Sequence, residues 1–138
     1  MNAEDLKALV ATRMEQAAEC IADGRFLLAA GRGPRTAINR AYYAAFYAVL
    51  ALLQTIGKTP RKHSGVLSLF DAEFVKPGLL AKELSFDLHR LFDMRQEDDY
   101  QRLEPIPQEE AAEALVLAEG FVQAICQYLT EKGHLTGP

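Results

Sequence analysis

The chain is 138 residues long, with 49% hydrophobic residues, 25% charged residues and a formal net charge of −4. This length indicates one domain, because two cores of half the size would each be too small to be stable alone. The composition excludes a disordered chain, a collagenous repeat and a disulfide scaffold. Ala (21) and Leu (19) far outnumber Val, Ile and Thr combined (17), which favours an all-α fold.

Turn residues divide the chain into five segments of helical length. Gly and Pro mark breaks at residues 31–34, 57–60, 77–78 and 103–107. Apolar residues recur within the segments at three- and four-residue steps, and strand-type alternation is not found. We therefore predict an antiparallel up-and-down bundle of about five helices, as a single domain over residues 1–138. The predicted helices are Ala3–Ala30, Pro34–Ile56, Arg61–Val75, Leu79–Arg102 and Gln108–Lys132.

The second predicted helix, Pro34–Ile56, is apolar on nearly all sides. It combines a stripe of alanines with a stripe of large apolar residues, while Arg40, Tyr43 and Tyr47 mark a third direction. Such a helix has to be covered on nearly all sides. Two interpretations stay open: it is the central core helix of one bundle, or part of it contacts a second subunit in a homodimer.

The sequence predicts a cytoplasmic protein without a membrane segment. Its N-terminus lacks the basic start and long apolar run of a signal peptide. The longest apolar run, residues 41–53, has 13 residues and includes three tyrosines, so it is too short and too polar to cross a bilayer. Cys20 and Cys126 have no Cys or His nearby at ligand spacing, so we interpret both as reduced core thiols and predict no metal site and no cofactor.

Arg95 is the first candidate site residue. It lies four residues after Leu91 and so continues the apolar stripe of its helix, where a charge is costly unless it is paired. Asp99 lies four residues further on and can pair with Arg95 on the same face. Arg95 and Asp99 either fix the end of the helix as an ion pair or present the arginine to a phosphate in a cleft.

Cations and aromatic residues around the second and third predicted helices form a further candidate group. Because the net charge is negative, any contact with nucleic acid has to be local, through a few arginines. Tyrosines at helical spacing either stack on a base or belong to the core. His63 is the residue type best suited to act as a general base near neutral pH, or it lies in a solvated loop. The residues in question are Arg32, Arg35, Arg40, Tyr42, Tyr43, Tyr47, Arg61, Lys62 and His63.

The segment Arg35–Ala48, RTAINRAYYAAFYA, resembles the signature of HEPN-domain proteins, in the branch of small stand-alone HEPN proteins. Three further segments match that branch in order: Lys62–Val66, Phe70–Lys76, and Arg95–Tyr100 followed by an Ala-rich last helix. The resemblance covers about residues 35–129. It implies a small up-and-down helical bundle, usually a homodimer, that is often paired with a minimal nucleotidyltransferase in toxin–antitoxin-like modules.

Many proteins of this family are metal-independent ribonucleases with an Arg-x4-6-His motif, in which Arg holds the scissile phosphate and His moves protons. The positions at that spacing after Arg95 are Tyr100, Gln101 and Arg102, and no arginine of the chain has a histidine there. Arg95 matches the arginine of the motif, whereas the histidine has no match.

Three functions are consistent with these residues. The first is the HEPN component of a nucleotidyltransferase-linked module, which binds a nucleotide, RNA or a partner protein in a dimer cleft. The second is a ribonuclease with an altered site, in which Arg95 and His63 are catalytic. The third is a structural dimerisation module. The predicted ligand-binding residues are Arg40, Tyr43, Arg95, Asp99 and Tyr100.

Overall fold

The computed structural model describes residues 1–100 and 103–136, with the backbone alone for residues 97–100. Within these ranges the chain consists of helices and connecting turns, and no strand is present. The all-α prediction is confirmed, since each of the five predicted segments contains one α-helix. The elements are α1 (Ala3–Ala29), α2 (Pro34–Thr55), α3 (His63–Phe70), the π-helical segment η1 (Asp71–Val75), α4 (Lys82–Tyr100) and α5 (Gln108–Glu131).

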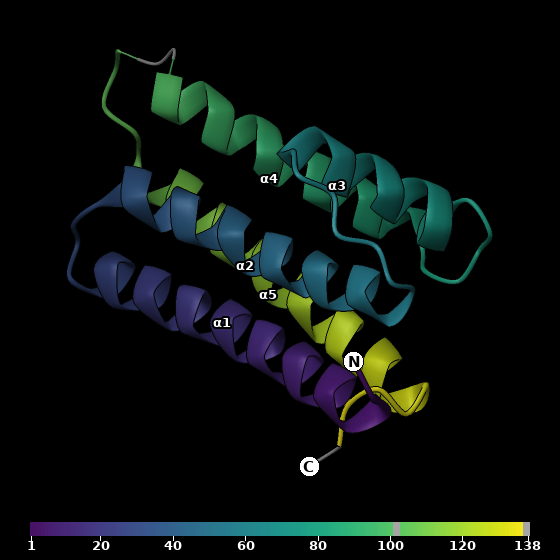
Figure 1. The fold of residues 1–138 in the computed structure, drawn as a ribbon. Coiled ribbons are helices and arrows are strands. Elements are labelled where there is room, and N and C mark those ends of the chain that lie inside the picture. Colours follow the sequence, from purple (N-terminus) through teal and green to yellow (C-terminus); the bar gives the residue numbers. More distant parts are fainter. Residues whose placement is uncertain (101–102, 137–138) are drawn as a thin grey trace.

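Local sequence explains the antiparallel pairing of α1 and α2 (Figure 1). Asn2 caps α1 by accepting a hydrogen bond from the backbone N–H of Asp5 at 2.8 Å, and the Asp5 carboxylate accepts one from the backbone N–H of Asn2. Gly31 and Gly33 then reverse the chain at φ of 68° and 60°, values that favour glycine. Pro34 begins α2 at a position where its missing N–H has no cost.

The central helix of the fold is α2. It packs against α1, α3, α4 and α5 within the same chain. Its small side chains allow the other helices to approach closely, and the whole stripe is fully buried. The core-helix interpretation therefore accounts for most of this helix, while a half-buried row of larger residues remains on one side. The stripe is Ala37, Ala41, Ala44, Ala48 and Ala51, and the half-buried row is Tyr43, Phe46, Tyr47 and Leu50.

The connection at residues 56–62 departs from strict up-and-down alternation. It returns along the bundle, so that α3 runs in the same direction as α2 (Figure 1). Two contacts support this direction. His63, the first residue of α3, contacts Tyr42 in the middle of α2, and Glu73 in η1, which follows α3, pairs with Lys58 just past the end of α2. The first residue of α3 consequently lies beside the middle of α2.

The third predicted helix, Arg61–Val75, is shorter than expected as an α-helix. Regular α-helix ends at Phe70 and continues as the π-helix η1, where the N–H of Lys76 donates to the carbonyl of Asp71 at 2.8 Å. The π-turn accommodates one more residue than an α-turn, a feature that hydrophobic periodicity does not reveal.

The two cysteines differ in environment. Cys20 is buried, as predicted, but Cys126 is exposed, so its predicted core position is wrong. Cys126 directly follows Ile125, a residue of the buried seam of α5, and a one-residue step turns a side chain by about 100° away from that seam.

No helix in the described part of the chain has the length and apolar character needed to cross a membrane.

A substitution of Phe121 on α5 tests how much this residue contributes to the stability of the core. Phe121 is fully buried and contacts the ring of Phe70, with 5.5 Å between ring centroids. Phe121→Ala should lower the free energy of unfolding by about 3–5 kcal/mol, because a cavity replaces the ring. Val116→Ala on the same helix is the control: Val116 is 61% exposed, so the change should stay within about 0.5 kcal/mol. Urea unfolding measures both, and equal effects would contradict this description of α5.

Candidate functional site

Aromatic and cationic side chains from three helices meet at one place, which we call the Tyr42 cluster. The middle of α2, the first residue of α3 and the last turns of α4 all contribute. The guanidinium carbon of Arg95 lies 5.5 Å from the centroid of the Tyr42 ring and 5.4 Å from that of Tyr43. The members of the cluster are Arg40, Tyr42, Tyr43, Phe46, His63, Phe92 and Arg95.

Residues of α2 hold the imidazole of His63 on several sides. The Tyr42 hydroxyl and His63 Nδ1 are 2.9 Å apart, within hydrogen-bond distance. The Phe46 ring is stacked on the imidazole with centroids 4.3 Å apart, and the Tyr43 ring meets it edge-on at 5.7 Å. His63 is therefore a fixed, half-buried part of the site rather than a solvated loop residue.

The electrostatics of the cluster favour a neutral histidine beside a permanent cation. Burial lowers the pKa of His63 below its ordinary value of 6.5, and the positive charge of Arg95 lowers it further. Burial raises the pKa of Tyr42, so its phenol keeps its proton. At neutral pH, Arg95 thus supplies charge, whereas His63 and Tyr42 are uncharged hydrogen-bonding groups.

The Tyr43 ring is contacted by two guanidinium groups. Arg40 Cζ lies 5.3 Å from its centroid, close to the 5.4 Å of Arg95. Arg40 is itself positioned by hydrogen bonds from Nη2 to the Asn39 side-chain oxygen at 2.9 Å and from Nη1 to Cys20 Sγ at 3.5 Å. Such guanidinium–ring contacts strengthen where solvent is excluded. The structure therefore brings together four of the predicted site residues, Arg40, Tyr43, His63 and Arg95.

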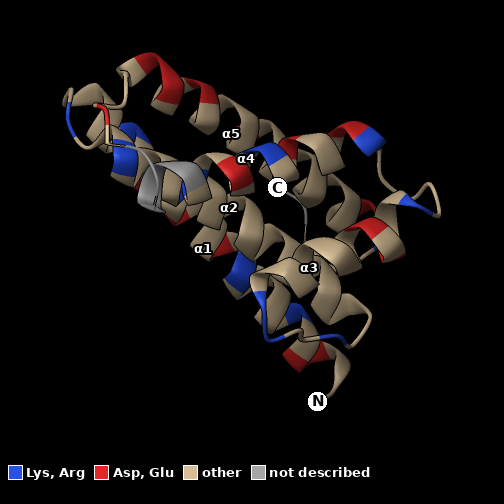
Figure 2. Cartoon of the chain, turned by 90° about the horizontal axis from the view of Figure 1, so that it is seen from above, with Lys and Arg blue, Asp and Glu red and all other residues tan. Residues whose placement is uncertain are grey.

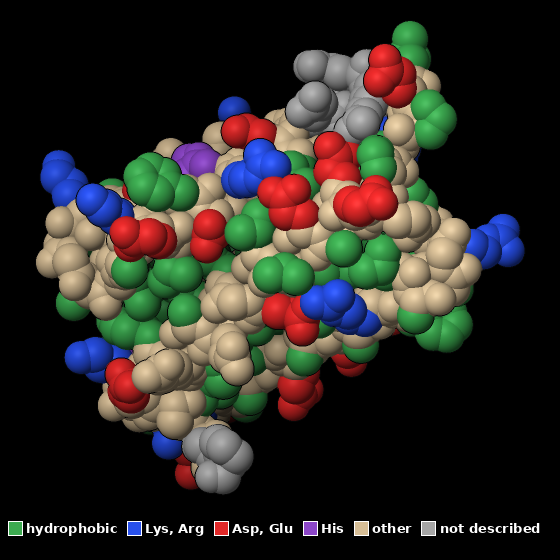
Figure 3. Space-filling model, turned by 180° about the vertical axis from the view of Figure 1, so that it is seen from behind, with side chains coloured by type: hydrophobic (Ala, Val, Ile, Leu, Met, Phe, Trp, Pro, Cys, Tyr) green, Lys and Arg blue, Asp and Glu red, His purple; other side chains and the backbone are tan. Residues whose placement is uncertain are grey.

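Of the other candidate residues, Tyr47 borders this cluster: its ring centroid lies 6.3 Å from that of Tyr43 and 6.3 Å from that of Phe46. The side chains of Asp99 and Tyr100, and with them the predicted Arg95–Asp99 ion pair, lie outside the described residues. Arg95 is partly exposed, so it is not a fully buried charge. Arg32 and Arg35 flank the turn between α1 and α2, while Arg61 and Lys62 precede α3. Figure 2 shows Lys and Arg scattered among Asp and Glu, and Figure 3 shows the same mixture on one face.

Three residues of the cluster, Tyr42, Phe46 and Phe92, are absent from the predicted catalytic and ligand-binding residues. Sequence periodicity left Tyr42 as either a base-stacking or a core residue, and the structure shows that it is fully buried and also contacts the site. Tyr42 and His63 are 21 residues apart, so no local spacing connects them. The Tyr42-Tyr43 doublet is the sequence feature that indicates a role for Tyr42. Adjacent helix positions face directions about 100° apart, so one ring can enter the core while its neighbour stays near the surface.

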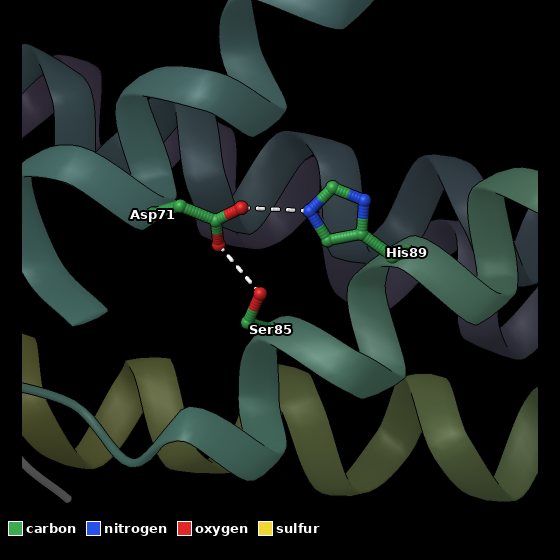
Figure 4. Close-up of polar contacts among 3 residues, drawn as sticks. All are labelled: Asp71, Ser85 and His89. Carbon is green, nitrogen blue, oxygen red and sulfur yellow. Dashed lines mark hydrogen bonds and ion pairs between the residues drawn. The ribbon is translucent and has the colours of Figure 1, made fainter. Parts of the chain in front are cut away.

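A second polar cluster connects η1 to α4 (Figure 4). The Ser85 hydroxyl donates to Asp71 Oδ1 at 2.6 Å, and His89 Nε2 lies 2.7 Å from Asp71 Oδ2. The serine and histidine contact different oxygens of one carboxylate. In a nucleophilic triad the histidine has to contact the serine hydroxyl, so this arrangement does not activate Ser85. The cluster instead fixes the π-helical segment against α4.

Among the described residues, no group of three or more His, Cys, Asp or Glu side chains is placed to hold a metal ion.

Comparison with known proteins identifies the family. Residues 10–129 match the HEPN domain, and the chain belongs to the HEPN domain family. A protein of Thermotoga maritima named "UPF0332 protein" is 44% identical over 110 residues, covering 80% of this chain and 83% of that protein. Two proteins of Methanocaldococcus jannaschii named "Putative toxin" are 40% and 36% identical, covering 73% and 70% of this chain and 69% and 72% of their own lengths. The family predicted from residues 35–129 is confirmed.

The His63 environment makes a testable pKa prediction. In a proton NMR titration, His63 should lose its proton below pH 6.5, and Arg95→Gln should move this pKa upward because a neighbouring positive charge is removed. The control is Arg90→Gln, which changes another arginine of α4 that pairs with Glu113. An unchanged His63 pKa in Arg95→Gln would show that the two side chains do not interact.

The same shift fixes the sign of a stability effect. Since the pKa of His63 is lower in the folded chain, the unfolded chain binds more protons just below pH 6.5, and folding stability falls as the pH decreases through that range. His63→Gln should flatten this part of the pH dependence, as measured by urea unfolding at a series of pH values. An unaltered slope would contradict the lowered pKa.

Proposed function

We propose that this protein is the HEPN component of a toxin–antitoxin-like module and that it binds a phosphate group of a nucleotide or of RNA at the Tyr42 cluster. The partner in such a module would be a minimal nucleotidyltransferase, as the family resemblance implies. Relatives that carry the name "Putative toxin" and align with about 70% of this chain support the first part of the proposal.

The observation that carries the binding proposal is the meeting of Arg95 and His63 at the Tyr42 ring. A guanidinium has a permanent charge and a planar fork of donors that matches two phosphate oxygens. The uncharged imidazole adds one hydrogen-bonding group beside it. Tyr43 and Phe46 supply half-buried ring surfaces on which a base can stack. Charge, polar recognition and stacking are thus available within one cluster.

Global charge supports a local mode of recognition. With a net charge of −4 and with Lys and Arg distributed among Asp and Glu along the helices (Figure 2), the protein as a whole does not attract nucleic acid. Affinity then depends on a few phosphate contacts around Arg95 and Arg40, and the salt dependence of binding should be shallow. This mode suits a nucleotide or a short RNA segment better than a long duplex.

We also propose that Tyr47 and Leu50, in the half-buried row on α2, form part of a homodimer interface, which leaves the rings of Tyr43 and Phe46 accessible to a ligand. Tyr43, Phe46, Tyr47 and Leu50 line one side of the central helix and are only partly covered by their own chain. Two-fold pairing through Tyr47 and Leu50 would bring two Tyr42 clusters toward each other and form the predicted dimer cleft.

Arg95→Ala should weaken the binding of AMP and of a short single-stranded RNA at least tenfold, because a charge-assisted contact to phosphate is lost. The matched control is Arg25→Ala, which removes an arginine of α1 that pairs with Glu119 on α5. Isothermal titration calorimetry at moderate salt measures both variants. Equal weakening by both, or no binding by the wild type, would contradict the proposal.

The proximity of His63 and Arg95 also supports the second candidate function, a ribonuclease with an altered site. Incubation of the wild type, Arg95→Ala and His63→Gln with total RNA decides between the two functions. Cleavage by the wild type that is lost in both Arg95→Ala and His63→Gln would establish the enzyme. Absence of cleavage, or equal cleavage by all three proteins, would exclude it.

Tyr47→Glu tests the dimer. If Tyr47 lies at the interface, a buried negative charge there should shift the protein from dimer to monomer in sedimentation velocity. Phe26→Glu is the control, because Phe26 is an aromatic residue of α1 that is 75% exposed. A Tyr47→Glu protein that remains dimeric would place the interface elsewhere, and a monomeric wild type would refute the homodimer itself.

A further inference from the structure

The hydrogen bond between the Tyr42 hydroxyl and His63 Nδ1 has two possible directions, because either group can be the donor. Both groups can donate or accept a hydrogen bond, so the 2.9 Å distance alone does not say which atom carries the proton. The direction matters, because it decides which of the two imidazole nitrogens is left with a lone pair.

Burial of Tyr42 distinguishes the two directions. The residue is 0% exposed, and its hydroxyl has no second hydrogen-bond partner among the described residues. If the hydroxyl accepted a hydrogen bond from an Nδ1–H group, its own proton would be buried without an acceptor, and its full desolvation cost would remain. If the hydroxyl donates to Nδ1, its buried proton has an acceptor and no desolvation cost remains.

We propose that Tyr42 is a positioning residue that donates its hydroxyl proton to His63 Nδ1 and so fixes the neutral imidazole as the tautomer that carries its proton on Nε2. Burial also raises the pKa of Tyr42, which keeps the donor proton in place. Burial and Arg95 lower the pKa of His63, which keeps the imidazole neutral and able to accept.

This tautomer determines what the site recognises, an extension that rests on the proposed phosphate-binding function. Nδ1 uses its lone pair on Tyr42, and Nε2 presents an N–H group that has no hydrogen-bond partner among the described residues. His63 therefore offers a donor next to the Arg95 cation. A ligand has to provide acceptor oxygens to both, as a phosphate does.

The same tautomer opposes a general-base role for His63. A base needs an unoccupied lone pair on the nitrogen that faces the substrate. In neutral His63, Nδ1 is engaged with Tyr42 and Nε2 already carries a proton, so neither nitrogen can take the proton of a ribose hydroxyl. The inference thus favours binding over cleavage at this site.

Tyr42→Phe isolates the hydroxyl. It retains the ring that Arg95 and Phe92 contact and removes only the oxygen that faces His63. Tyr43→Phe is the matched control, because its ring also contacts Arg95 and His63, but no hydrogen bond joins its hydroxyl to the imidazole among the described residues.

The test is two-bond ¹H–¹⁵N correlation NMR on the full-length, ¹⁵N-labelled protein at about pH 8, where imidazoles are neutral. His63→Gln assigns the His63 signals among those of His89 and His134. The wild type and Tyr43→Phe should show His63 with protonated Nε2 and unprotonated Nδ1. Tyr42→Phe should show a mixture of both tautomers, and its affinity for inorganic phosphate should fall roughly three- to tenfold.

A wild-type His63 with its proton on Nδ1 would overturn the inference, as would a tautomer that does not change in Tyr42→Phe. The wild-type spectrum alone is decisive if Tyr42→Phe does not fold. A different result would contradict the proposed function alone. If the wild type has the expected tautomer but added phosphate shifts none of its signals, the site does not bind phosphate, whereas Tyr42 still orients His63.

Discussion

The enclosure of α2 by four other helices is the constraint on which the rest of the structure depends. An Ala stripe lets these helices approach closely, and the large residues on the enclosed sides of α2 are buried with it. Tyr42 is one of them, and it brings a polar atom into the interior. A buried hydroxyl needs a partner, and the first residue of α3 provides it. The requirement that stabilises the core therefore also positions His63.

The site and the core share residues. Tyr42 fills the interior, contacts His63 through its oxygen and lies within cation–π distance of Arg95. Tyr43, its neighbour in sequence, lies at the boundary with solvent and contacts both Arg40 and Arg95. Tyr42 thus contacts His63 and Arg95 from the core, whereas Tyr43 contacts Arg40 and Arg95 at the boundary with solvent. In this way Tyr42 links the positions of His63 and Arg95 to the packing of the core.

The helices could be predicted from the sequence, because their stability comes from periodic apolar positions and from Gly and Pro at their ends. The burial of the Ala stripe and the family followed from the same residues. The π-turn at Asp71 could not be predicted, since it depends on a shift of one residue that periodicity tolerates. The exposure of Cys126 could have been predicted, because this residue lies one step off the buried seam of α5. Arg40, Tyr43 and Arg95 were predicted together as ligand-binding residues, and His63 was predicted as the catalytic partner of Arg95. The position of His63 could not be derived, because it depends on the direction in which the 56–62 connection runs, and the contact between Tyr42 and His63 was missed for the same reason.

The returning connection also links the site to the fold. His63 stands at the junction between the 56–62 connection and α3, so its position depends on the length of that connection. Loops of this kind accept insertions and deletions at little thermodynamic cost. However, a change of length there that withdrew the imidazole would leave the buried Tyr42 hydroxyl without its partner, so it would cost the core stability as well as alter the site. The length of this connection is therefore constrained by the core as well as by the polar site.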